Sequence, residues 1–119
     1  MNDSSRTDRT PLAGVPELAE RQLELYQDLH AHPELSHQET RTAGIAAEAL
    51  REAGFEVHKN VGTTGVVGVL SQGEGPVVLV RADMDALPLQ EQTGLDYAST
   101  QTARGAWWRA GARDARLRA

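Results

Sequence analysis

The 119 residues are 39% hydrophobic, 24% charged and 4% aromatic, with no cysteine, which is an ordinary composition for a single folded domain. Without cysteine there is no disulfide framework and no thiolate nucleophile, so a metal site has to use His, Asp or Glu. The net charge of −5 argues against nucleic acid as the main partner, and no apolar run approaches the ~18 residues of a membrane helix. We therefore expect a cytoplasmic protein that does not contact membranes.

The charge is distributed unevenly along the chain. Residues 1–100 hold 7 Lys and Arg against 16 Asp and Glu, a net of −9, whereas residues 101–119 hold 5 and 1, a net of +4. This break predicts three parts: a disordered polar leader at 1–14, a partial α/β domain at 15–100, and an atypical basic tail at 101–119 that is out of frame or disordered.

The first predicted element is a helix from Pro16 to about Ala31. Proline suits the first turn of a helix, and Leu18 and Leu25 fall on one face at helical spacing. Pro33 ends the helix, because proline biases the residue before it away from helical backbone.

A second helix is predicted at about 37–53. Ser36 and Glu39 have the spacing of a capping box, with Ser36 as the N-cap. Gly54 follows the last apolar position, where glycine commonly ends a helix.

Three strands are predicted next, at 55–58, 66–70 and 77–80. The last is a run of four apolar residues, which is typical of a strand buried on both faces in the middle of an α/β sheet. Glycine and proline at 71–76 predict a turn, so we expect a hairpin between the last two strands. Gly62 to Gly68 lacks the spacing of a phosphate loop and leads into a strand, so a simple turn explains it better.

Two carboxylates, Asp83 and Asp85, come directly after the apolar run. Ligands of open α/β sheets bind outside the carboxyl ends of the strands, where these residues are expected. The two acids could hold a divalent cation, or one could orient a histidine ligand. A loop whose carboxylates accept backbone N–H bonds explains the spacing equally well.

The histidines near the end of the first helix are further candidates. His30 and His32 do not share a helical face, so they could chelate a metal only from an irregular turn. Histidine is also favourable at a helix C-terminus for electrostatic reasons, without any metal. His58, on a strand, is expected to face solvent.

Several segments together resemble the opening of the aminoacylase-like metallopeptidases, in the branch of hippurate hydrolases, N-acyl-amino-acid amidohydrolases and auxin-conjugate hydrolases. The resemblance spans about residues 18–100 and keeps its order throughout. It rests on DLHAHPELS (28–36), ET (39–40), LREAGFEV (50–57), TGVVG (64–68), LVRADMDALP (79–88) and GLDYAS (94–99).

The resemblance implies an α/β catalytic domain with two zinc or manganese ions that hydrolyses the amide bond of N-acyl amino acids. Asp85 corresponds to the acid that orients a metal ligand in relatives. Asp83 stands where many relatives have a histidine ligand, so it is a metal-site candidate of lower rank.

The chain departs from this family after Ser99. The family continues with a segment that supplies cysteine and histidine ligands, and no such segment follows here. We therefore expect a truncated amidohydrolase that is inactive alone, without its general base. The alternative is a non-catalytic remnant or a small binding module.

Overall fold

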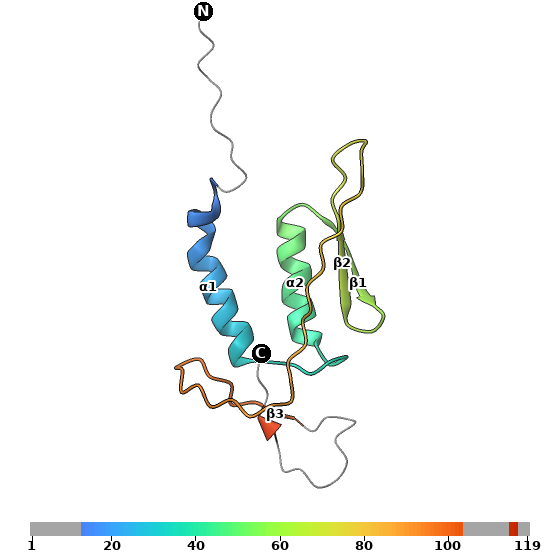
Figure 1. Cartoon of the computed structure of the whole chain (residues 1–119). Coiled ribbons are helices and arrows are strands. Elements are labelled where there is room, and N and C mark those ends of the chain that lie inside the picture. The colour runs from blue at the N-terminus through green and yellow to red at the C-terminus, as the bar shows by residue number, and fades with distance from the viewer. Residues whose placement is uncertain (1–12, 104–114, 117–119) are drawn as a thin grey trace, which may run out of the picture.

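The computed structural model describes residues 13–103 and 115–116, and the sequence predictions for 1–12, 104–114 and 117–119 lie outside these residues. The chain forms two helices and then an antiparallel hairpin, and Figure 1 shows α2 between α1 and the hairpin. A second pair of two-residue strands lies in the tail segment and is also antiparallel. The elements are α1 (Val15–Ala31), α2 (Thr40–Glu52), β1 (Glu56–Val61), β2 (Gly65–Val69), β3 (Thr102–Ala103) and β4 (Ala115–Arg116).

The predicted first helix is confirmed. Helix α1 has a proline in its first turn, and its end is capped by His32, whose backbone N–H donates to the carbonyl of Leu29. Most of its surface is exposed: Leu18 is 50% and Leu23 is 55% accessible. Only the C-terminal turn is well covered, with His30 buried there. Helix α1 is therefore anchored to the rest of the chain mainly by its C-terminal end.

The second helix is confirmed, but the predicted capping box is wrong. Helix α2 begins at Thr40, and Ser36 lies in the turn before it. The carboxylate of Glu34 accepts instead from the backbone N–H groups of Arg41, at 3.0 Å, and Thr42, at 2.7 Å. The chain reverses between Leu35 and the helix, so the carboxylate six residues before the helix start lies over its free donors.

The C-terminal end of α2 is as predicted. Gly54 has a φ of 86°, which is favourable only for a residue without a Cβ atom. Its N–H donates to the carbonyl of Arg51, and the N–H of Phe55 donates to the carbonyl of Leu50. These two bonds form a Schellman motif, which turns the chain directly into β1.

The hairpin joins different strands from those predicted. Strand β1 pairs with β2 in antiparallel register, from Glu56 opposite Val69 to Val61 opposite Gly65, with an irregularity after Lys59. The turn between them has a glycine at φ 66° (Gly62), so it closes tightly enough to return the chain at once. The Gly62 region is thus a turn into a strand, as expected, and His58 faces solvent.

The predicted third strand at 77–80 is not formed. These residues have no regular secondary structure, and their exposures range from 82% to 96%. A strand buried on both faces needs a neighbour on each edge and cover on each side, and the described residues supply neither. The apolar run therefore lies extended and uncovered, and it does not form a hairpin with β2.

The core lies where α2 covers the hairpin and where the turn before α2 meets residue 86. Ala43 and Ala47 of α2 are buried, as are Leu35 and Ala86. Helix α2 packs against both β1 and β2. At Gly68 a Cβ atom would come within 3.1–3.2 Å of the side chains of Leu50 and Phe55, so glycine permits the close packing of helix and hairpin. This compact α/β unit fixes the turn on which the candidate site is built.

Candidate functional site

Asp83 and Asp85 lie on the irregular stretch that follows the exposed apolar run. Asp83 forms an ion pair with Arg81, and both side chains are largely exposed, at 65% and 78%. Asp85 is exposed as well. The structure therefore exposes both acids to solvent and pairs Asp83 with the guanidinium of Arg81.

The residue after Asp85 is fixed to the turn between the helices. The backbone N–H of Ala86 donates a 2.7 Å hydrogen bond to the carbonyl oxygen of Glu34. Ala86 also forms a parallel bridge with Leu35. Asp85 therefore stands at the point where the irregular segment joins the core, which gives its backbone a defined position.

His32 lies in an ionic network at the end of α1. Its Nδ1 donates a 2.8 Å hydrogen bond to the backbone carbonyl of Asp28 and lies 3.4 Å from the carboxylate of the same residue. Arg41 of α2 binds that carboxylate with two hydrogen bonds of 2.7 and 2.8 Å. The network ties the C-terminal end of α1 to α2 through the side chains of Asp28 and Arg41.

His30 is buried and faces a carboxylate 61 residues away in the sequence. Its Nε2 lies 2.7 Å from Oε1 of Glu91, and the side chains are only 6% and 1% exposed. Because an ionised carboxylate can only accept, the imidazole nitrogen carries the proton of this bond. The ring also lies 5.7 Å from the ring of Tyr26 and 5.4 Å from that of Tyr97.

Glu91 accepts hydrogen bonds on both oxygens. Thr93 donates its hydroxyl to Oε1, which His30 also contacts, and the backbone N–H of Ser99 donates to Oε2 at 2.7 Å. The bonds from Thr93, His30 and Ser99 hold the pKa of Glu91 at about 2, well below its ordinary value. The carboxylate is therefore ionised throughout the neutral range, and it joins α1 to the segment that follows Asp85.

A second buried carboxylate, Glu39, joins α2 to the hairpin. Its Oε2 accepts the hydroxyl of Thr64, while His37 Nδ1 lies 2.9 Å from the hydroxyl of Thr63. Burial raises the pKa of Glu39, but the bond from Thr64 and backbone bonds outweigh it, so the pKa lies below its ordinary value. His37 and Thr63 have φ values of 64° and 109°. These strained turns are held against each other by the paired side chains.

The donor set does not fit a dinuclear metal centre. Within residues 13–103 and 115–116, no three His, Asp or Glu side chains gather so that they could hold a metal ion. His30 and His32 each use a ring nitrogen in a hydrogen bond, and the other nitrogen of His30 is buried without a hydrogen-bond partner among the described residues. The described part of the chain therefore offers single donors rather than a complete coordination shell.

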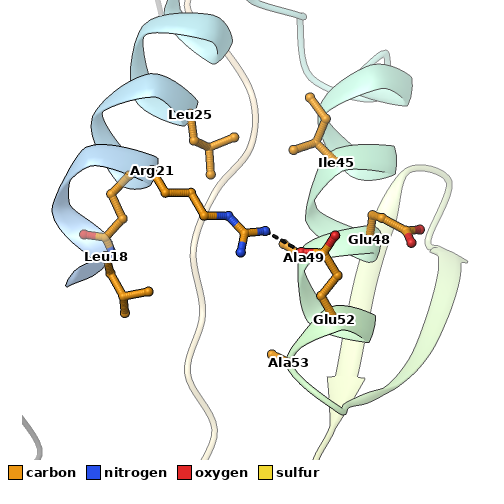
Figure 2. Close-up of a pocket in the computed structure, with 9 residues that line it drawn as sticks. Leu18, Arg21, Leu25, Ile45, Glu48, Ala49, Glu52 and Ala53 are labelled. Atoms are coloured by element: carbon orange, nitrogen blue, oxygen red, sulfur yellow. Dashed lines mark hydrogen bonds and ion pairs between the residues drawn. The ribbon is translucent and has the colours of Figure 1, made fainter. Parts of the chain in front are cut away.

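A groove of about 510 Å³ lies away from these acids, between α1 and α2. Figure 2 shows Arg21 reaching from α1 across the groove to Glu52 of α2. Leu18, Leu25 and Ile45 supply apolar lining. Arg21 and Glu52 pair with each other across the groove, and Glu48 pairs with Arg51 of its own helix, so these charged groups already have partners.

No family model matches the chain. It is 46% identical over 89 residues to a hippurate hydrolase of Campylobacter jejuni, which covers 71% of this chain and 23% of that protein. It is also 46% identical over 72 residues to an N-acyl-L-amino acid amidohydrolase of Geobacillus stearothermophilus, covering 60% and 20%.

A solved structure shares the fold at higher coverage. The YXEP protein of Bacillus subtilis, described as a dinuclear metal-binding peptidase of the M20 family, matches with a TM-score of 0.67 and 34% identity. The match covers 87% of this chain and 26% of that structure. This chain is homologous to the aminoacylase-like metallopeptidases of the M20 family. It spans about a fifth of the length of the curated relatives named above.

M20 homology explains why the two helices and the hairpin occur in this order, since they match the N-terminal part of an M20 peptidase domain. The sequence analysis missed Glu34 and Glu91 as structural carboxylates, and it assigned Glu39 to a capping box instead of to its bond with Thr64. Each bonds to groups that are distant in sequence or lie in a turn, and no local pattern separates them from the other acids. Among the described residues, no helix has both the length and the apolarity needed to cross a bilayer.

Proposed function

We propose that this chain supplies part of the catalytic domain of a metal-dependent hydrolase acting on the amide bond of N-acyl amino acids. The observation that carries the proposal is the 46% identity to a hippurate hydrolase over 89 residues, with the fold match to a dinuclear metal-binding peptidase in support. Both matches include most of the described chain. The proposed setting is the cytoplasm, without nucleic acid or membrane partners.

Within such a hydrolase we assign Asp85 as the acid that orients a metal ligand. Its support is positional: Asp85 follows an apolar run and precedes a residue fixed by the bridge between Leu35 and Ala86. A carboxylate on a firmly held backbone can keep a ligand ring in one orientation. Asp83 has a weaker claim, because Arg81 already pairs with it.

The proposed metal, zinc or manganese, would supply Lewis-acid activation of the amide carbonyl and of water. The described residues do not complete a site for it, so we propose that the 119 residues alone bind no metal ion tightly and hydrolyse no N-acyl amino acid. The ligands and the general base would come from outside the described residues.

The test is a chimera in which residues 18–100 replace the matching segment of the Campylobacter hippurate hydrolase. We expect the chimera to fold, to bind its metal and to release glycine from hippurate. Asp85→Asn should lower kcat/KM by about 10- to 100-fold, the usual range for a residue that orients a metal ligand. Asp96→Asn, at another exposed acid, serves as the matched control and should change little.

A chimera that is folded by circular dichroism but inactive and free of metal would contradict the proposal. That outcome would favour the non-catalytic alternative, a remnant or small binding module. An active chimera in which Asp85→Asn and Asp96→Asn behave alike would retain the enzyme class and remove Asp85 from the site.

A further inference from the structure

The segment from residue 86 to residue 99 has a defined course without forming a helix or a strand. Three of its residues are buried: Ala86 at 5%, Glu91 at 8% and Ser99 at 4% exposure. The residues between them are mostly exposed. A stretch with so little regular structure depends on a few specific contacts to hold its position.

Glu91 makes most of those contacts. Burying a carboxylate is costly unless donors replace the water that solvated it. Here Thr93 and Ser99 are donors from the same segment, and His30 is a donor from α1. One side chain therefore closes residues 91–99 into a loop and fastens that loop to the helix.

His30 is held in the orientation that this contact needs. Its ring contacts that of Tyr26, four residues earlier on α1, and that of Tyr97, which belongs to the same loop, and the two tyrosine rings also contact each other, with their centroids 6.0 Å apart. Tyr97 meets His30 edge-on, with the ring planes at 84°. Aromatic contacts of this kind restrict rotation of the imidazole, so Nε2 stays directed at Glu91.

The first residue of the segment, Ala86, is held by the turn that follows helix α1. Glu34 and Leu35 follow His30 closely and bind the backbone of Ala86. Asp85 is the next residue outward. The segment after Asp85 is thus attached to residues 30–35 at two points, one through backbone and one through side chains.

We propose that Glu91 is a positioning residue for the hydrolase site, which acts on Asp85 by fastening the segment that follows it to helix α1 through His30. This inference rests on the proposed function in naming Asp85 as the group that is positioned. The fastening itself is a property of the 119-residue chain and can be measured without catalysis.

The first measurement is amide hydrogen exchange on the 119-residue chain. Glu91→Gln places one amide NH2 against donors that the carboxylate accepts, so at least one of the bonds to His30, Thr93 and Ser99 is lost. Protection of the Ser99 amide should fall about tenfold or more, and protection of the Ala86 amide should fall with it. Glu74→Gln, at an exposed carboxylate, is the matched control and should leave both unchanged.

The second measurement uses the active chimera described above. Glu91→Gln should lower kcat about tenfold with KM within about twofold, because misplacing a supporting group affects the reaction more than substrate binding. His30→Gln retains an N–H donor for Glu91 and should keep more activity than His30→Ala. A purely structural role predicts that the loss of activity in each variant follows the fall in its melting temperature.

The outcomes separate the two proposals. An inactive parent chimera overturns the proposed function, while exchange in the 119-residue chain still decides whether Glu91 fastens the segment. An active chimera in which Glu91→Gln leaves kcat unchanged overturns the positioning role. Unchanged protection of Ser99 and Ala86 in Glu91→Gln overturns the fastening itself.

Discussion

Replacing Glu34 by alanine tests which side chain caps helix α2. The structure gives Glu34 two hydrogen bonds from the first turn, at 3.0 and 2.7 Å, and it gives none to Ser36. Loss of a side-chain cap costs about 0.5–2 kcal/mol. Loss of a negative charge at a helix N-terminus costs a further ~0.3–1 kcal/mol at an exposed site.

We therefore expect Glu34→Ala to lower the free energy of unfolding by about 1.5 kcal/mol, between the limits set by these two effects. For a domain of this size that corresponds to a fall in Tm of roughly 6–12 °C. The assay is thermal unfolding of the 119-residue chain, followed by circular dichroism at 222 nm. Glu34→Gln keeps the shape of the side chain and isolates the contribution of charge.

Ser36→Ala is the matched control, because Ser36 is the cap that the sequence pattern favours. In the structure this hydroxyl caps nothing, so its removal should change stability by no more than about 0.5 kcal/mol. The reasoning is refuted if Ser36→Ala costs more than Glu34→Ala. That result would mean that α2 begins earlier, with the capping box formed.

Three further predictions concern acid stability, packing and association. The pKa of Glu91 in the folded chain is about 2, below its ordinary 4.5, so its contribution to the free energy of unfolding is complete above pH 4.5 and is lost as the pH falls toward 2. Urea unfolding between these pH values should therefore depend less on pH in Glu91→Gln than in the unchanged chain. Gly68→Ala should destabilise by about 1–3 kcal/mol because its Cβ would crowd Leu50, whereas Gly44→Ala, in open space on α2, should stabilise by about 0.5–1 kcal/mol, both by denaturant titration. Leu79 is 88% exposed, so Leu79→Lys should leave the melting temperature unchanged and reduce association measured by light scattering; a fall in melting temperature would show that residue 79 is covered in solution.

The helices could be predicted from sequence because their signals are local. Pro16, the apolar spacing on α1 and Gly54 at the end of α2 each act within a few residues, and the structure has them as expected. The predicted capping box was wrong because local spacing does not show how the turn before the helix folds. Ser36 and Glu39 have the right spacing, but the turn at Leu35 carries Glu34 over the helix start and directs Glu39 to Thr64.

The strands and the site depend on partners that are distant in sequence. Residues 77–80 have strand composition, yet composition cannot supply neighbouring strands, so they remain extended and exposed. The link between His30 and Glu91 spans 61 residues and has no sequence period. Asp83 and Asp85 could be located as candidates, but their roles could not be derived, because a role depends on which groups surround them.

The bridge between Leu35 and Ala86 also has a consequence for the order of folding. Helix α2 and the hairpin are consecutive in sequence and contact each other directly, so their assembly requires only short loops to close. The Leu35–Ala86 bridge closes a loop of about 50 residues, whose entropy has to be lost before the contact forms. During synthesis, residues 40–69 can therefore fold as they emerge, whereas His30 stays without its carboxylate until residue 91 has been made.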